Sequence, residues 1–256
     1  MSFFNKMLAT IGIGSAKVDT KLKKGTLAQG EKIEGVVEIT GGSIEQQIDE
    51  IYLTLITNYI KEVDDKKFTE HAVISKVKIN EPFVITANET KSIPFSFMLP
   101  YDTPITIGKT RVWINTGLDI KGAVDPSDKD YVKVVPNPLM NAVLNSIEEI
   151  GFSLREIENE VASYRLRKRL PFVQEFEFYP TRGEFRGRLD ELEVVFFQKN
   201  DREIDILMEI DRKARGLAGL LSEALETDET HIKLTVTSND LDFLTEKISQ
   251  IIRSYS

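Results

Sequence analysis

The chain has 256 residues, a hydrophobic share of 41% and a formal net charge of −8 at pH 7. This length accommodates one large domain or two of ordinary size. The acidic balance argues against nucleic-acid binding, which needs a basic face to displace counterions, and weakens any general attraction to anionic membranes. Because the chain has no cysteine, it has neither a disulfide framework nor thiolate chemistry.

The first residues predict a short amphipathic helix over 2–11. Its apolar residues recur at spacings of three and four: Phe3, Phe4, Met7, Leu8 and Ile11. The favoured interpretation is a helix that packs on the body of the protein. The alternative is a helix that docks on a membrane or a partner, although one lysine gives a weak anchor. The segment lacks the features of a signal peptide, and no run approaches the ~20 apolar residues of a membrane span.

From Ala16 onward the pattern is that of β-strands. Alternation of apolar and polar residues predicts strands at 18–22, 33–39, 48–63, 73–79, 81–85, 93–99, 110–120 and 131–135. On the strand that follows the turn at 64–67, Val73, Val77 and Ile79 are expected to share one face. Short strands separated by turns are typical of a sandwich or barrel, and Trp113 is expected in its core.

A linker is predicted at Val135-Pro136-Asn137-Pro138. Pro136 ends the preceding strand because it cannot donate to a ladder, Asn137 is a favoured N-cap, and Pro138 suits the first helical position. The apolar stripe that follows predicts a helix at about 138–149, with Gly151 at its C-cap. Burial of this stripe, on the second domain or across the junction, is expected to set the angle between domains through Leu139, Val143, Leu144 and Ile147.

Composition changes at the same linker. The residues before Asn137 include 16 Lys and 1 Arg against 18 acids, whereas those from Asn137 onward include 5 Lys and 11 Arg against 23 acids. The two halves therefore carry net charges of −1 and −7. We expect two β-sandwich domains, 1–136 and 137–256, each with its own core and with no sheet that continues from one into the other.

The second half is again mainly β. Its predicted strands lie at 151–158, 161–169, 172–179, 187–198, 203–212 and 230–237. The segment 216–224 stays open between a short helix and a loop. The chain then predicts a final helix with Asn239 as its N-cap and one apolar stripe: Leu241, Leu244, Ile248, Ile251 and Ile252.

Three segments carry a family resemblance: FFNKMLATIGIGSAKVDTKL, PFSFMLPYDTPIT and WINTGLDIKGAVDPSDKDYVKVVPNP. With the two-sandwich layout they resemble the SpoOM sporulation-control proteins, over essentially the whole chain. The resemblance implies a mainly all-β, arrestin-like fold: two β-sandwich domains with short N-terminal, linker-following and C-terminal helices. It also implies a cytosolic regulator linked to sporulation, without an enzymatic site to carry over. Residue spacing itself says nothing about sporulation.

The densest basic cluster is the candidate partner-binding site. Arg165, Arg167 and Arg169 alternate, so on a strand they would share one face and could grip phosphates or carboxylates bidentately. The alternative, which we favour, is a strand whose arginines are paired with nearby acids such as Glu156, Glu158 and Glu160.

The other polar constellations favour ordinary structural roles. His71 and His231 have no residue beside them that would make either a catalytic base. Asp125, Asp128 and Asp130 lack the order of an EF-hand loop, so a solvated turn is favoured over a metal site. The sequence therefore predicts no catalytic residues, no metal and no cofactor.

Three functional hypotheses follow. The leading one is a non-enzymatic, cytoplasmic regulatory or scaffold protein that binds other proteins through sandwich edges and the groove between its domains. The second is a peripheral membrane or trafficking adaptor that uses the N-terminal helix and the basic strand. The third, a hydrolase, is disfavoured because no nucleophile has a partner base. The partner protein stays unidentified, a homo-oligomer stays open, and no nucleic acid is expected.

Overall fold

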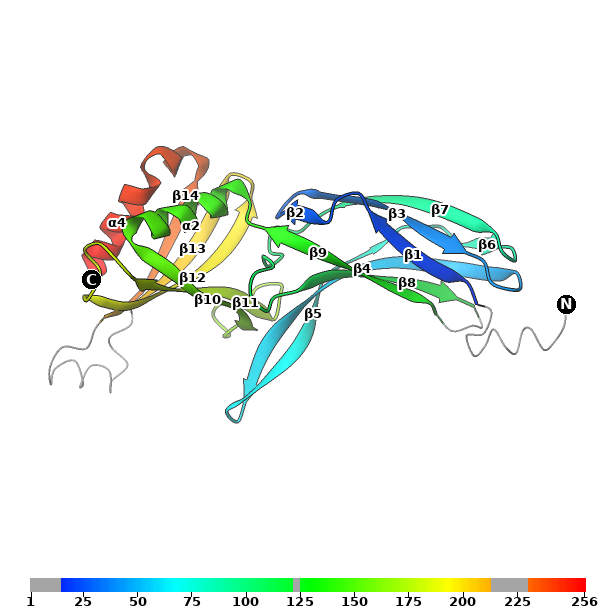
Figure 1. Cartoon of the computed structure of the whole chain (residues 1–256), viewed down its shortest axis with the longest axis horizontal. Helices are drawn as coiled ribbons and strands as arrows, with labels where there is room; N and C mark the ends of the chain where they lie inside the picture. The colour runs from blue at the N-terminus through cyan, green and yellow to red at the C-terminus, as the bar shows by residue number, and fades with distance from the viewer. Residues whose placement is uncertain (1–14, 122–124, 213–229) are drawn as a thin grey trace. The chain divides into compact units, whose positions relative to one another are not determined.

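The computed structural model describes residues 15–121, 125–212 and 230–256 (Figure 1). The helix predicted at 2–11 and the open segment at 216–224 lie outside these residues. The described chain forms two compact units. The first contains the described residues up to Asn58, 71–106 and the described residues of 111–135; the second contains 59–70, 107–110 and the described residues from Pro136 onward. Strands predominate in both, which confirms the mainly β fold class.

The first unit is a sandwich of two sheets. The smaller sheet is antiparallel and consists of β1 (Lys17–Leu22), β3 (Lys32–Thr40) and β7 (Thr90–Met98), in that order. The larger sheet contains β4 (Gln46–Val63), β5 (Lys66–Lys78), β6 (Phe83–Ile85), β8 (Val112–Ile120), β9 (Ser127–Val135) and β2 (Thr26–Ala28).

Alternate residues of these strands face the core of the first unit. Ile33, Val37 and Ile39 of β3 are buried, as are Ile51 and Leu53 of β4. This period of two is what a half-buried strand requires, and it is the pattern that predicted the strands. Trp113 is 6% exposed, so its predicted burial is confirmed.

The second unit is one sheet covered by helices. Its strands form an antiparallel meander: β10 (Phe152–Val161), β11 (Phe172–Pro180), β12 (Leu189–Asn200), β13 (Glu203–Arg212) and β14 (Thr230–Thr237). The helical elements are α2 (Pro138–Ile150), the 3₁₀ helix η1 (Ser238–Phe243) and α4 (Leu244–Tyr255). Helix α2 contacts α4, β10 and β13, and Figure 1 shows both helices over the same side of the sheet.

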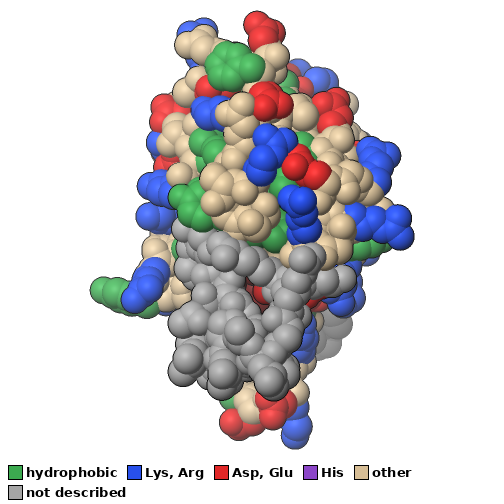
Figure 2. Space-filling view, turned by 90° about the vertical axis from the view of Figure 1, so that its left-hand side faces the viewer, with side chains coloured by type: hydrophobic (Ala, Val, Ile, Leu, Met, Phe, Trp, Pro, Cys, Tyr) green, Lys and Arg blue, Asp and Glu red, His purple; other side chains and the backbone are tan. Residues whose placement is uncertain are grey.

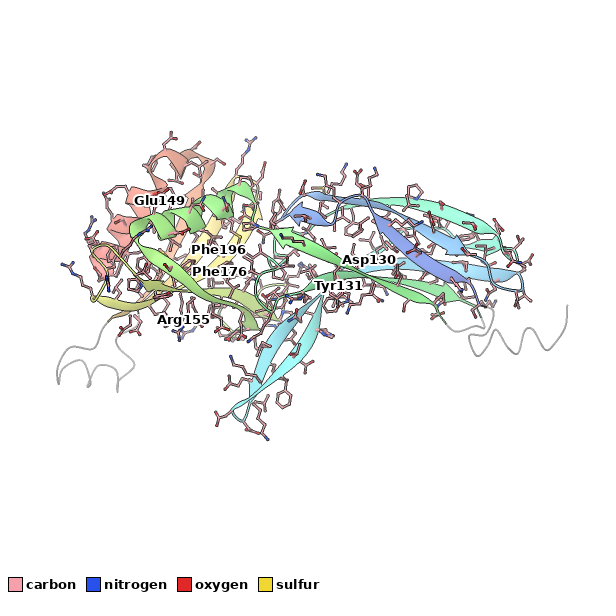
Figure 3. All side chains as sticks on the ribbon, in the orientation of Figure 1. Asp130, Tyr131, Glu149, Arg155, Phe176 and Phe196 are labelled. Carbon is pink, nitrogen blue, oxygen red and sulfur yellow. The ribbon has the colours of Figure 1, made fainter. Side chains whose placement is uncertain are left out.

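The second unit therefore differs from the second β-sandwich that the sequence predicted. In the described part of the second unit the layer that covers the meander is made by α2 and α4, not by another sheet. The physical reason is that each helix carries an apolar stripe, and the inward face of the sheet is the apolar surface that can bury both. Phe176 of β11 and Phe196 of β12 meet edge to face within this unit, with ring centroids 4.9 Å apart (Figure 3).

The predicted linker and helix ends are confirmed. Asn137 Oδ1 accepts a hydrogen bond from the Met140 amide at 2.9 Å, which makes Asn137 the N-cap of α2, and Pro138 is the first helical residue. Gly151 ends the helix with φ of +116°. A Cβ at this position would lie 2.4 Å from the carbonyl oxygen of Arg182. Glycine is therefore required there by both conformation and space.

The stripe of α2 is buried within the second unit. Leu139, Val143 and Ile147 are buried, and Leu144 is half-buried. At the adjoining surface, Thr245 of α4 donates to Glu149 Oε2 at 2.8 Å (Figure 3). The predicted role of these residues in setting the angle between domains stays a prediction.

Two segments of the first half belong to the second unit. The Tyr59 ring stacks on Phe172 with centroids 5.6 Å apart, and Ile60 of β4 pairs in parallel with Glu160 of β10. Through this one pair the hydrogen-bonded strand order runs on from β10 to β4. The expectation of sheets that do not continue between halves is therefore wrong at this point, whereas independent folding of 1–136 and 137–256 stays a prediction.

Three local predictions were wrong. In β5 the buried residues are Ala72 and Ile74, while Val73 is 56% exposed. The strand predicted at 161–169 is a loop, which spans 162–171. Near the C-terminus the N-cap of η1 is Thr237, whose amide donates to Asp240 Oδ2, and the N-cap of α4 is Phe243, so the predicted N-cap Asn239 is wrong. In the described residues, no helix has the length and apolar character that a membrane span needs.

Candidate binding surfaces

The basic cluster lies on a closed loop between β10 and β11. The amide of Ala162 donates to Pro171 O at 3.0 Å and closes the base of the loop. The amides of Leu166 and Arg167 both donate to Ser163 O, at 3.1 and 2.9 Å, which folds the chain into a turn. The arginines at 165, 167 and 169 are all exposed, but they do not share the face of a strand. The strand placement was wrong because Leu166, in the middle of the run, is held by packing.

Leu166 anchors this loop on the sheet. It packs against the buried cluster Ala162, Val173 and Val195, together with Phe197 and Leu207. These residues lie on the face of the meander opposite the helices, since their neighbours along each strand point to the other side. An apolar zone on this face thus fixes the position of the cations on either side of Leu166.

A hollow of about 180 Å³ lies beside the loop. We call it the basic-loop hollow. Arg165, Leu166 and Lys168 line it from the loop, and Lys233 lines it from β14. Its other lining residues come from β12 and β13: Phe197, Asp205, Ile206 and Leu207. The Lys168 ammonium lies 5.9 Å from the centroid of the Phe197 ring.

Charge in the basic-loop hollow is unevenly compensated. Asp205 accepts from Lys199 Nζ at 2.9 Å and from Thr235 Oγ1 at 2.7 Å, and it lies 3.6 Å from Lys233 Nζ. The Lys199 hydrogen bond is the main cause that lowers the pKa of Asp205. Arg165 and Lys168 make no ion pair with any residue in the described ranges. The pairing predicted for the basic cluster therefore does not account for these two cations.

The remainder of the same sheet face is acidic. Cross-strand register places Glu177 opposite Glu193, and Glu193 opposite Glu209. Burial, followed by the carboxyl of Glu193, raises the pKa of Glu175 to about 8. Opposed like charges on neighbouring strands are destabilising, and the raised pKa keeps Glu175 mostly protonated at neutral pH, which relieves part of this repulsion.

One irregularity of β10 places a cation among these acids. The register between β10 and β11 shifts between Leu154 and Glu156. The residue at that shift, Arg155, lies 3.4 Å from Glu191 and 4.0 Å from Glu177 (Figure 3). A bulge re-aims a side chain in this manner. Figure 2 shows the end of the second unit, where cationic and acidic side chains intermingle around scattered hydrophobic ones.

The histidines and the acidic loop, which the sequence analysis also considered, have ordinary structural contacts where they are described. The His71 ring meets the edge of Trp113 with centroids 5.0 Å apart, and the side chain of His231 lies outside the described residues. Asp125 accepts from the Ile120 amide at 3.0 Å and Asp128 from the Thr20 amide at 2.7 Å. Burial and then Asp128 raise the pKa of Asp130 to about 6. In the described residues no three His, Asp or Glu side chains form a group suited to a metal.

Most sheet edges in the described chain are short or blocked. Strands β2 and β6 have three residues each, and β7 carries Pro94 at its centre, which lacks the N–H that a partner strand would need. At β14, Thr235 O accepts from Lys247 and the Thr237 amide donates to Asp240 at 2.7 Å. The C-terminal helical segment thereby covers part of that edge.

The edge of β5 is longer and more open. Among the described strands β5 pairs with β4 alone, and its His71–Lys78 segment belongs to the first unit. Val73 is 56% exposed there. Lys76 lies over the Tyr52 ring, 3.8 Å from its centroid, and Lys78 pairs with Glu50 at 3.1 Å. Both lysines are thus drawn toward neighbouring residues of β4.

Comparison with known proteins gives consistent matches. A family model described as "SpoOM protein" matches residues 4–214. The "Sporulation-control protein spo0M" of Bacillus subtilis (strain 168) is 43% identical over 252 residues, which cover 98% of this chain and 96% of the relative. The crystal structure of Spo0M, sporulation control protein, from Bacillus subtilis aligns with a TM-score of 0.85 at 42% identity, covering 95% of this chain and 100% of that chain.

Proposed function

The chain belongs to the SpoOM protein family, as the resemblance of its sequence predicted, and from this premise we propose that it is a non-enzymatic, cytoplasmic regulator of sporulation that acts by binding other proteins. The name of the Bacillus subtilis relative supports the control of sporulation. The openness of the β5 edge supports the mode of binding. A partner would add an extended segment to this edge.

The observation that carries the proposal is the contrast between β5 and the edges formed by β2, β6, β7 and β14. A sheet edge binds an incoming strand through main-chain hydrogen bonds, and alternate side chains provide specificity. Natural sheets usually discourage such pairing with prolines, short strands or covering segments. Pro94 in β7 and the Asp240–Lys247 pair beside β14 fit those devices, whereas the His71–Lys78 segment presents the exposed Val73.

The charges at this edge indicate the chemistry of the partner segment. Lys78 is already paired with Glu50, but Lys76 lies over the Tyr52 ring near the end of β5, so an extended segment with an acidic residue beside its apolar ones is complementary. Electrostatic complementarity of this kind fixes register and discriminates among partners more than it adds affinity.

Complementation tests this function. The chain and its variants would be expressed in a Bacillus subtilis strain that lacks its own 43%-identical relative, and heat-resistant spores would be counted. We expect the unmodified chain to restore sporulation control. Val73→Lys should abolish that effect because a charge on the exposed edge residue opposes strand addition.

Met98→Lys is the matched control. Met98 is 55% exposed on the edge strand β7, so the substitution introduces the same charge at an edge that Pro94 already blocks. Complementation by Met98→Lys but not by Val73→Lys supports the proposal. Equal complementation by both variants, with equal protein levels, would remove β5 from the function.

The membrane-adaptor alternative has lost one of its two supports. It relied on a basic strand, which the structure replaces by the loop at 162–171, and on the segment 2–11, which lies outside the described residues. Flotation with anionic liposomes separates the two functions, because a protein-binding regulator stays at the bottom of the gradient.

A further inference from the structure

The basic-loop hollow combines an anchored loop with unmatched positive charge. Arg165, Lys168 and Lys233 line it, against one acid, Asp205, which already accepts from Lys199. This excess of cations occurs in a half of the chain whose net charge is −7. A surface selected only for solvation would place these cations beside the abundant acids. Instead, Leu166 holds the loop over an apolar zone.

Distance separates this hollow from the acidic part of the same face. Phe197 pairs with Asp205, whereas Glu193 pairs with Glu209. Four residues along β12 correspond to about 13 Å, which exceeds the Debye length of about 8 Å at physiological ionic strength. Glu193 and Glu209 therefore repel an anion in the hollow only weakly. Glu175 lies nearer, since it pairs with Val195, but its pKa of about 8 leaves it mostly uncharged at neutral pH.

The lining also indicates the form of the anion. A guanidinium donates two parallel hydrogen bonds to a phosphate, and ammonium groups add point charges. Phe197 and Leu207 supply an apolar floor, which suits a ring or a hydrocarbon stem carrying the phosphate. The volume of about 180 Å³ is below the roughly 300–1,000 Å³ of sites for drug-sized ligands and cofactors, so a single side chain fits better than a nucleotide.

We propose that the basic-loop hollow binds a phosphorylated side chain of a partner protein. Arg165 and Lys168 hold the phosphate, Lys233 completes its charge balance, and Phe197 contacts the apolar part of the side chain. This site is separate from the β5 edge and does not depend on strand addition there. The sequence left the ligand of the basic loop open between phosphates and carboxylates. The proposal assigns it one class, a phosphate carried by a side chain.

Titration calorimetry on the full chain tests the site. The probe is a five-residue peptide with phosphotyrosine between alanines, and the same peptide without phosphate is its control. We expect only the phosphorylated peptide to bind. In the double variant Arg165→Gln with Lys168→Gln its Kd should rise at least tenfold, because two charged donors are lost. Both residues are exposed, so the melting temperature should stay unchanged.

Arg202→Gln is the matched control for the loss of a surface cation. Arg202 is exposed in the turn between β12 and β13, and its removal should leave the Kd within twofold. Inorganic phosphate and vesicles that contain phosphatidic acid should bind more weakly than the peptide. The proposal is overturned if the peptide does not bind, if the double variant binds it equally well, or if inorganic phosphate or the vesicles bind more tightly.

Discussion

Single acidic residues of the second unit change their protonation when the chain folds. Glu175 illustrates this most clearly, because burial and then the Glu193 carboxyl raise its pKa from 4.5 to about 8. Glu160 and Glu209 add smaller repulsions. A carboxyl with a raised folded-state pKa stabilises the fold when protonated, and this contribution is lost as the pH rises from about 4.5 through about 8.

Glu175→Gln should therefore change how stability depends on pH. We expect the variant to match the parent chain near pH 5 and to melt several degrees higher near pH 9, because the amide carries no charge. Thermal melts followed by circular dichroism at a series of pH values provide the measurement. Glu81→Gln, at an exposed loop position, is the control. A constant difference between Glu175→Gln and the parent chain at all pH values would contradict the assignment.

Gly151 is a second residue whose identity is dictated locally. An alanine there would need φ near +116° and would place its Cβ against Arg182 O. Gly151→Ala should lower the free energy of unfolding by about 1–3 kcal/mol. Gly117→Ala is the control, since no atom lies within 4 Å of its added Cβ. Denaturant unfolding that shows equal stability for the two variants would contradict this account.

At the scale of elements, the sequence predicted what local chemistry determines. Asn137, Pro138 and Gly151 identified both ends of α2 because caps act within one turn. The β13 and β14 boundaries also agree with the predicted ranges, since alternation of apolar and polar residues is a local signal. The wrong positions depend on contacts far along the chain. Leu166 packs on Val195 and Leu207, and this packing makes a loop of a segment whose alternation indicated a strand.

The candidate site could be predicted from the sequence only in part, for the same reason. The density of basic residues in the sequence identified Arg165, Arg167 and Arg169. Of these three, only Arg165 lines the hollow, together with Lys168. Phe197, Asp205 and Lys233 were missed because only the register of β12, β13 and β14 brings them together. A single sequence contains no signal for that register beyond the strands themselves.

Helix α2 provides a test at this scale. Val143 is 1% exposed, so Val143→Asp would bury a carboxylate without a partner and should cost about 3 kcal/mol or more. Asn145→Asp, on the exposed side of the same helix, should have little effect. Thermal unfolding measures stability, and small-angle scattering measures the domain arrangement. No change in either would show that the stripe of α2 neither stabilises the second unit nor fixes the arrangement.

At the scale of the whole molecule, the second unit includes two segments from the first half of the chain, 59–70 and 107–110. Lys67 and Lys109 lie 3.0 and 3.2 Å from the carboxylate oxygens of Glu158, whose side chain is 10% exposed. Tyr59 adds its stack on Phe172. These contacts belong to segments 59–70 and 107–110, which the fragment 137–256 would lack. Removal of both lysines would leave the Glu158 charge without these partners, a costly change for a nearly buried carboxylate.

The fragments 1–136 and 137–256 test this sharing. We expect each to unfold cooperatively, as the predicted domains require, but 137–256 should melt several degrees below its transition in the full chain. Differential scanning calorimetry of the fragments and the chain gives both results. An unfolded 137–256 fragment would contradict independent domains, and an unchanged transition would show that Tyr59, Lys67 and Lys109 add no stability.

The central claim, that the protein regulates by binding a partner strand at β5, is tested most directly by photo-crosslinking in sporulating cells. A photoreactive amino acid would replace Val73 in one version of the chain and Met98 in another, both exposed on edge strands. We predict a discrete crosslinked partner from position 73 and none from position 98. Crosslinks of equal yield from both positions, or from position 98 alone, would contradict the claim.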